Sequence, residues 1–405
     1  MRFKYLYIAL FSFLLLSTTV ALQTNETSDA YKLLSKKSSY TAGDVIELQF
    51  SITGNTDVYL YCSNSYGSVV LNPVTNENRL NFTIPESISK KSGVLNWQLI
   101  SDTTELAGQV NILPKANIKT IESYLGPPSI EAGGTDFTML VVIPTDDLDN
   151  PLIDSTKVVI KHQFLSNQNA SDVFTEHGFG YKNIYSKTKS GRILISSDSF
   201  DLNSKEYDVN VVPAIPTNFK INAERIHEYA DGNQITTFRT TVIRDRYNNI
   251  VSDGTFVTFF ITNTKGYKSK TSGTTINGIA TAKLVQPDHE DQWTVKAYVE
   301  GMANSNTIVL EYKQAVEDYN VVFSKDKRTI TIGPLKSFMN QRIPDGLHVQ
   351  LSIYKNGVLE DESIENSLNG MAKFHLNPDR FSKGNYKLVF TAAGITKTYE
   401  DVRYE

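Results

Sequence analysis

Residues 146–154 read DDLDNPLID, and residues 245–253, 99 positions later, read DRYNNIVSD. The two stretches align without a gap, and each leads into a run of the form T-x-V, at Thr156 and Thr255. A weaker third copy, NQRIPDG, occupies residues 340–346. Asp and Asn side chains turn a chain by bonding to nearby backbone, and they tolerate left-handed backbone angles. The repeat therefore predicts that one plan of strands and turns is copied along the chain.

A second motif, Asn-Gly, is also repeated along the chain. Asn277-Gly278 precedes the run IATA, and Asn369-Gly370, 92 positions later, precedes MAKF. Asn-Gly is the strongest short signal for a hairpin because both residues accept positive φ angles. The first quarter of the chain is more divergent, although SYTAGD at its start resembles SIEAGG 90 positions later. We place a signal peptide at 1–21 and four domains at 22–114, 115–213, 214–313 and 314–405.

Runs that alternate apolar and polar residues recur between clusters of Gly, Asn, Asp and Pro. Examples are VIELQF at 45–50, TFVTFF at 255–260 and YKLVF at 386–390. A period of two is typical of half-buried strands, and long helical periodicity is absent from the sequence after residue 21. The single cysteine, Cys62, allows no intramolecular disulfide, so each domain has to be stabilised by its own core. We therefore predict an all-β protein of tandem β-sandwich domains.

The N-terminus has the three parts of a secretory signal. Arg2 and Lys4 precede an apolar run at 6–16, and residues 19–21 supply the small side chains that a signal peptidase reads. The apolar run is shorter than the roughly 20 residues that a helix needs to cross a bilayer. We expect cleavage after Ala21 and an exported protein without a transmembrane span in its mature chain. Secreted, periplasmic and cell-surface locations all stay open.

The order of motifs in residues 214–313 resembles the bacterial immunoglobulin-like domain of the invasin and intimin type. The motifs are VIRD, NNIV, VTF, TINGIATA and WTVKA, in that order. The match is fair over 115–213 and weak elsewhere, and Ile250 stands where the family's pattern has proline. The resemblance implies tandem immunoglobulin-like β-sandwiches after the signal peptide, used as a surface stalk or adhesin spacer. It implies no ligand, because function in such proteins sits on sites carried by the fold.

The sequence contains no recognised catalytic motif. There is no G-x-S-x-G elbow, P-loop or G-x-G-x-x-G, and the six histidines lack the spacing of a zinc site. Paired carboxylates for glycoside hydrolysis stay open, since any two acids can meet in space. The balance of 40 Lys and Arg against 44 Asp and Glu argues against a nucleic-acid partner. We expect neither an enzyme nor a cofactor.

A calcium site is the metal hypothesis that the sequence suggests. Asp146, Asp147, Asp149 and Asp154 gather in one turn near an expected domain edge, and hard oxygen ligands there could bind a cation. The favoured alternative is an Asx-rich turn with solvated carboxylates, because the later copy of the stretch keeps fewer acids.

A ligand site is expected in a long insertion from Gln163 to Lys189, whose counterpart at 262–274 is shorter. Aromatic residues on a mobile loop can stack on sugars or anchor a protein. The favoured alternative is an extra hairpin that covers a sheet edge. The candidate residues are Phe174, His177, Phe179, Tyr181 and Tyr185.

Two functions follow from these observations. The leading hypothesis is a non-catalytic exported multi-domain protein acting in cell-surface adhesion, surface assembly or partner binding, with a protein or glycan partner at the cell surface. The alternative is a polysaccharide- or envelope-protein-binding accessory of a secretion or degradation system.

Overall fold

The computed structural model describes residues 31–53, 57–101 and 105–404. The expected signal peptide at 1–21 lies outside these residues. Strands dominate the described chain, and its one helix is the four-residue α2, Glu86–Ser89. None of the helices in the described part of the chain is long and apolar enough to cross a membrane. The all-β prediction is confirmed.

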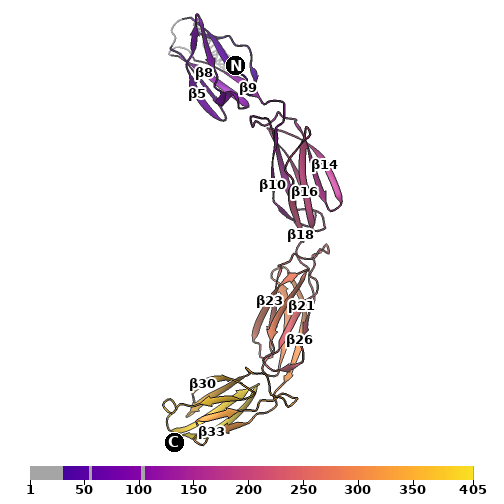
Figure 1. Ribbon diagram of the computed structural model, residues 1–405, viewed down its shortest axis with the longest axis vertical. Helices are drawn as coiled ribbons and strands as arrows, with labels where there is room; N and C mark the ends of the chain where they lie inside the picture. Colours follow the sequence, from indigo (N-terminus) through magenta and orange to yellow (C-terminus); the bar gives the residue numbers. More distant parts are fainter. Residues whose placement is uncertain (1–30, 54–56, 102–104, 405) are drawn as a thin grey trace, which may run out of the picture. The chain divides into compact units, whose positions relative to one another are not determined.

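The described strands fall into four consecutive groups, and each sheet is built from strands of one group only (Figure 1). Group 1 contains residues 31–113, group 2 residues 120–212, group 3 residues 221–314 and group 4 residues 321–404. In groups 1 to 3, a short early strand pairs in parallel with the last strand. The neighbouring long strands, such as β8 and β9 or β25 and β26, pair antiparallel. This arrangement is the immunoglobulin-like sandwich that the sequence analysis predicted.

Group 1 has two sheets with strand orders β1-β3-β7-β6 and β2-β9-β8-β4-β5. Both contribute to one buried cluster, in which the ring of Phe50 meets Phe82 and Trp97 edge to face, with ring centroids 5.8 and 5.4 Å apart. Cys62 is buried in the same cluster, and burial raises the pKa of its thiol to about 12. The strands are β1 Tyr31–Leu33, β2 Ser39–Thr41, β3 Glu47–Ile52, β4 Tyr59–Asn64, β5 Gly67–Leu71, β6 Val74–Asn76, β7 Arg79–Thr83, β8 Gly93–Ile100 and β9 Glu105–Leu113.

Group 2 has strand orders β10-β12-β15 and β11-β18-β16-β13-β14, with β17 paired to β16. Alternation is clear in β12 and β16, where every second side chain is buried. The strands are β10 Thr120–Gly126, β11 Ser129–Glu131, β12 Phe137–Thr145, β13 Lys157–Phe164, β14 Asn167–Phe174, β15 Gly180–Tyr185, β16 Gly191–Ser199, β17 Leu202–Asn203 and β18 Tyr207–Val212.

Group 3 forms one continuous ladder, β19-β21-β24-β23-β22-β25-β26-β20. The Asn277-Gly278 hairpin joins β23 to β24, and both turn residues have positive φ, as predicted. The buried cluster of this group includes Phe238, Phe259 and Trp293. The strands are β19 Ile221–Glu224, β20 Tyr229–Ala230, β21 Ile235–Thr240, β22 Phe256–Thr262, β23 Lys268–Ile276, β24 Ile279–Val285, β25 Asp291–Val299 and β26 Ala303–Gln314.

Group 4 has strand orders β27-β28-β31 and β30-β29-β32-β33 around a third buried cluster. Phe390 of β32 lies at its centre, and its ring contacts those of Phe323, Phe374 and Tyr399. The strands are β27 Val321–Phe323, β28 Thr329–Ile332, β29 His348–Lys355, β30 Val358–Asn366, β31 Ala372–His375, β32 Gly384–Ala392 and β33 Ile395–Tyr404.

By its internal contacts the chain divides into two compact units. Of the described residues, unit 1 contains those up to 128 together with 138–184 and 193–209, and unit 2 contains 129–137, 185–192 and those from 210 onward. Group 1 therefore shares a unit with most of group 2, and groups 3 and 4 share the other with the remainder of group 2.

The expected insertion from Gln163 to Lys189 is corrected by the structure. Its residues form β14, which pairs with β13 along its whole length, and β15, which belongs to the other sheet. Group 3 has the same two strands as β23 and β24. The sequence of β14, NQNASDVF, reads as a loop because an exposed edge strand buries almost no apolar side chain. Only the β14–β15 connection, residues 175–179, is longer than its counterpart at 277–278.

Gly108 tests the packing of group 1, because a Cβ at this position would overlap the indole of Trp97. We predict that Gly108→Ala lowers the free energy of unfolding by about 1–3 kcal/mol, the usual cost of overpacking a core. Gly67→Ala is the matched control, since a Cβ there meets nothing within 4 Å. Chemical denaturation of both variants measures the difference, and equal stabilities would contradict the packing described.

Candidate functional site

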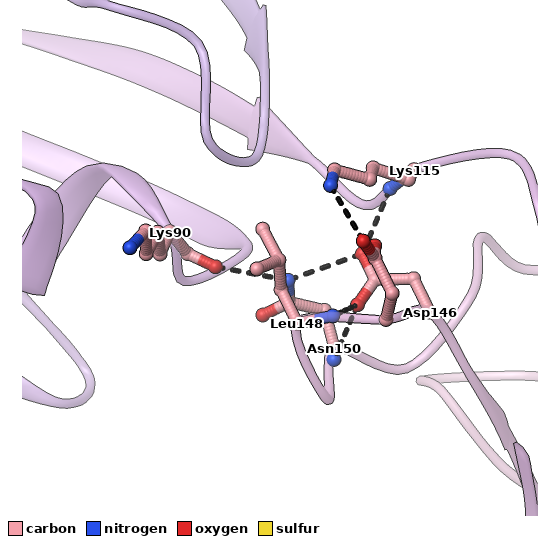
Figure 2. Close-up of polar contacts among 6 residues, drawn as sticks. Lys90, Lys115, Asp146, Leu148 and Asn150 are labelled. Atoms are coloured by element: carbon pink, nitrogen blue, oxygen red, sulfur yellow. Dashed lines mark hydrogen bonds and ion pairs between the residues drawn. The ribbon is translucent and has the colours of Figure 1, made fainter. Parts of the chain in front are cut away.

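The repeated turn at Asp146 is organised around one buried carboxylate (Figure 2). Its Oδ1 accepts hydrogen bonds from the backbone N–H groups of Leu148 and Asn150, both at 2.9 Å. Its Oδ2 accepts the N–H of Lys115 at 2.9 Å and the side-chain amide of Asn150 at 3.2 Å. Lys115 belongs to the connection between groups 1 and 2. The carboxylate therefore shapes its own turn and also binds the connecting segment.

Asn150 extends the same network into group 1. Its Nδ2 donates to the carbonyl oxygen of Lys90 at 3.0 Å, and its Oδ1 accepts the N–H of Ser92 at 2.9 Å. Lys90 is the C-terminal cap of α2, so the amide satisfies a carbonyl that the helix end leaves without a helical partner. The side chain of Asn150 has no exposed surface. One Asp–Asn pair thus joins a turn of group 2, the connecting segment and a loop of group 1.

The pair Asp245 and Asn249 repeats this network 99 positions later. Oδ1 of Asp245 accepts the N–H groups of Tyr247 and Asn249 at 2.8 Å, and Oδ2 accepts the N–H of Ala214 at 2.9 Å and Nδ2 of Asn249 at 2.8 Å. Asn249 also donates to the carbonyl oxygen of Thr188 at 2.8 Å and accepts the N–H of Ser190 at 2.9 Å. We call each of these two networks an Asp–Asn clamp.

The third residue of each clamp turn adds an apolar or aromatic contact. Leu148 packs against the buried cluster of group 1. Its Cδ1 lies 3.3 Å from the point that a Cβ would occupy if Gly43 had a side chain. Tyr247 lies in the same way against Gly133, and its hydroxyl is 3.2 Å from the point that a Cβ of residue 133 would occupy. Both glycines have positive φ, +88° and +151°. A side chain at either glycine would be strained and would push against the clamp turn.

Electrostatics favour the charged form of both clamp carboxylates. Burial by itself would raise the pKa of Asp146, but hydrogen bonds from Asn150, Lys115 and Leu148 outweigh it and lower that pKa below its ordinary value. Burial likewise opposes ionisation of Asp245, and hydrogen bonds from Asn249, Ala214 and Tyr247 lower its pKa. Several N–H donors aimed at one carboxylate stabilise the anion in this way.

The third copy of the turn keeps the backbone path but loses the clamp. Ser337 donates its N–H to the carbonyl of Gln341 at 2.7 Å, as Asp146 and Asp245 do to their asparagines at 2.9 Å. Ser337 Oγ accepts the N–H of Met339 at 3.3 Å, the bond that a carboxylate oxygen makes in the other copies. Ser337 and Gln341 thus stand where the clamps have Asp and Asn, and no carboxylate lies at this position.

Other contacts occur where the third clamp would be. The rings of Tyr229 and Phe338 stack with centroids 3.7 Å apart and an interplanar angle of 11°. The side-chain amide of Gln314 donates to the carbonyl oxygens of Val316 and Ala393. Neutral groups and an aromatic stack therefore connect groups 3 and 4, whereas a buried anion connects the earlier pairs.

The acids proposed for calcium have separate roles. Asp146 forms the clamp and is not solvated, which differs from the favoured alternative of the sequence analysis. Asp147 pairs with the ammonium of Lys115 at 2.9 Å, and Asp154 Oδ1 accepts the N–H of Gly178 at 3.1 Å. Asp149 occupies the positive-φ position of the turn, at 62°. Among the described residues there is no group of three or more His, Cys, Asp or Glu side chains that could hold a metal ion.

The aromatic candidates lie on two different sheets. Phe174 ends the edge strand β14, while Tyr181 and Tyr185 lie on β15, and all three side chains are at least half exposed. Phe179 and His177 lie in the connection between the two strands. The ring of Tyr185 packs against that of Phe137, and the two ring centroids are 5.2 Å apart.

Sequence reasoning missed Asn150 and Asn249. Both asparagines were assigned only to the turn, although each joins the turn to a neighbouring group. The signal that could have found them is the identical D-x-x-x-N spacing of the two copies, in which the intervening residues differ.

Comparison with known proteins reveals similarity in solved structures only. No protein-family model and no curated protein matches the chain. The chain is similar to the Escherichia coli adhesin FdeC, with 14% identity over 70% of this chain and 96% of that chain and a TM-score of 0.45. It is also similar to invasin, a bacterial integrin-binding protein, with 14% identity over 92% of this chain and 78% of that chain and a TM-score of 0.43.

A further similar structure is the Yersinia pseudotuberculosis adhesin InvE, with 15% identity over 53% of this chain and 67% of that chain and a TM-score of 0.27. The order of motifs in residues 214–313 resembles that of the domains of invasin-type proteins. At these identities the likeness concerns the fold alone.

Replacing Asn150 by leucine keeps the number and branching of the side-chain heavy atoms and removes the bonds to group 1. We predict that the amide of Ser92 exchanges with solvent about 10–100 times faster, because an N–H that loses a buried acceptor loses about 1–3 kcal/mol. The amide of Lys115 should change less, since Asp146 still accepts its bond. Hydrogen exchange read by mass spectrometry or NMR tests this. Asp147→Ala is the control, and an unchanged Ser92 amide in the Leu variant would refute the clamp.

The lowered pKa of Asp245 predicts a dependence of stability on pH. A carboxyl whose pKa is lower in the folded state stabilises the fold above its unfolded value of roughly 4, and this stabilisation is lost as pH falls through the folded value. Denaturation of the wild-type chain from pH 6 to pH 2.5 should therefore show declining stability. Asp245→Asn should cost about 2–4 kcal/mol at pH 7, because it leaves buried donors without an anion. A pH profile with the same slope in both proteins would contradict this role.

Proposed function

We propose that this chain is a non-catalytic, exported multi-domain protein that acts in cell-surface adhesion, surface assembly or partner binding. Its four strand groups would be four sandwich domains with boundaries at 22–114, 115–213, 214–313 and 314–405. Its location would be the cell surface, the periplasm or the medium. The observation that carries the proposal is the Asp–Asn clamp, which occurs twice with the same donors and acceptors.

A clamp of this kind suits a scaffold rather than a reaction. Domains joined by short connections move relative to one another by default, unless specific contacts oppose the motion. Here the carboxylates of Asp146 and Asp245 bind the connecting segment, and the amides of Asn150 and Asn249 bind the preceding group. All four side chains are buried, so water competes poorly for these bonds. In both copies of the repeat, the buried polar side chains therefore bind one strand group to the group before it.

A protein that presents a binding surface to a partner gains from such fixed joints. Ordering a flexible chain on binding costs free energy, and joints that are already ordered reduce that cost. FdeC and InvE are adhesins by name, and invasin is an integrin-binding protein. Adhesion is the role that we propose for this chain.

A second candidate function is that of a binding accessory for polysaccharide or an envelope protein. The exposed rings of Tyr181 and Tyr185 on β15 favour it, together with Phe179 beside that strand. Rings that present a flat apolar surface to solvent are suited to stacking on sugars or on a protein partner.

Adhesion assays on the source cells would test the proposal. Cells that carry or lack the chain would be counted on surfaces coated with proteins and with polysaccharides. We expect the wild-type chain to increase attachment and the double variant Asn150→Leu/Asn249→Leu to reduce that gain several-fold at equal export. Asp147→Ala is the matched control, because it alters an exposed ion pair beside the clamp.

Equal attachment with and without the chain on every surface would overturn the adhesion proposal. Loss of polysaccharide attachment in Tyr181→Ala alone, with the clamp variant unaffected, would instead favour the accessory function.

A further inference from the structure

The outer face of the larger group 1 sheet carries a hollow of about 480 Å³. Its lining residues belong to β4, β8 and β9, of which β8 and β9 are labelled in Figure 1. The lining residues on which the inference rests are Tyr61, Ser63, Asn96, Gln98, Ala107 and Gln109.

The strand register arranges these residues in two rows. Tyr61 pairs with Gln98, which pairs with Ala107, and in the next row Ser63 pairs with Asn96, which pairs with Gln109. Residues directly opposite one another point to the same face of a sheet. The residues between them, Cys62 and Trp97, are buried in the core. Each row therefore spans three strands on the solvent side.

The chemistry of the hollow is polar and uncharged. No Lys, Arg, His, Asp or Glu is among the described residues that line it. The side chains offer hydroxyl and amide groups, which both donate and accept hydrogen bonds. Nε2 of Gln109 donates to Oδ1 of Asn96 at 3.0 Å, which fixes two neighbouring amides. The half-buried ring of Tyr61 adds an apolar surface, and the small Ala107 leaves room beside it.

Group 2 has a hollow of about 440 Å³ on β13, β14 and β16 of its larger sheet, of which β13 and β16 hold the positions of β4 and β8 in group 1. Lys161 and Ser196 pair there as Tyr61 and Gln98 do in group 1. The group 2 hollow is charged, however, because its lining includes Lys161 and Glu206, and Lys161 pairs with Asp198 at 2.6 Å. The larger sheets of groups 1 and 2 thus each have a hollow, but the one in group 1 has an uncharged lining.

We propose that the group 1 hollow binds a neutral saccharide. Sugar hydroxyls match the amide and hydroxyl groups of both rows, and a sugar ring can stack on Tyr61. An anionic ligand would find no cation among the described lining residues, and an apolar peptide would cover the amides of Asn96 and Gln109 without offering them any hydrogen bond beyond the one between them. The inference rests on the proposed binding function and names its ligand class.

The test uses the mature full-length chain on a glycan array, followed by calorimetry. The probes are neutral gluco-, manno- and galacto-oligosaccharides, with uronate and sulfated oligosaccharides as anionic counterparts. We expect neutral oligosaccharides to bind, and Tyr61→Ala and Gln98→Leu each to weaken binding at least tenfold. Lys161→Ala is the matched control at the equivalent position of group 2, and Tyr181→Ala controls for the β15 aromatics.

Each outcome decides the proposal. Thermal unfolding of Tyr61→Ala checks that the domain is intact, and Tyr61→Phe should keep most binding because the ring remains. Absence of neutral-saccharide binding, binding of anionic probes alone, or loss of binding only in Lys161→Ala or Tyr181→Ala would overturn the inference. Cell attachment that persists without any saccharide binding would reject this site while leaving the adhesion function in place.

Discussion

The buried carboxylate of the clamp is the interaction on which the arrangement of neighbouring groups depends. Asp146 and Asp245 each accept four hydrogen bonds from N–H groups, of which one comes from the connecting segment. Charged acceptors form stronger hydrogen bonds than neutral ones, so the anion offsets the cost of its own burial. Serine at position 337 has one oxygen and no charge, and it accepts a single bond from its turn. The difference between the joints follows from two substitutions in the repeat, Ser337 in place of Asp and Gln341 in place of Asn.

Two kinds of stabilisation are separated in this chain. Apolar burial acts inside the sandwiches, as the clusters around Phe50, Phe259 and Phe390 show. Buried polar bonds act where groups 1 to 3 meet, and they satisfy backbone groups such as the carbonyl of Lys90 and the N–H of Ser92. A buried polar group that lacks a partner is costly, so each clamp is stable only as a complete set. A chain without disulfides can thereby order its joints as well as its cores.

The sequence was sufficient for the fold class because its strong signals are local. Asn277-Gly278 forms the hairpin expected of it, and the alternating runs at 45–50 and 386–390 lie within or next to strands β3 and β32. Residues 163–189 were misread because β14 is an edge strand whose exposed side chains lack the alternating pattern. The clamp was missed for a different reason. Whether an acid is solvated or buried depends on which N–H groups the fold brings to it, and Lys115 and Ser92 are distant from Asp146 and Asn150 in the sequence.

The most direct test of the clamp is a measurement of the carboxyl groups themselves. Titration of the side-chain carboxyl carbons of Asp146 and Asp245 by ¹³C NMR, in the intact mature chain, reports the pKa of each in the folded state. A pKa for both residues below the ordinary aspartate value of about 3.9 is the predicted result, because four N–H donors stabilise each anion. Titration of either carboxyl at or above that value would mean that burial outweighs the donors, and the account of the joints would be wrong.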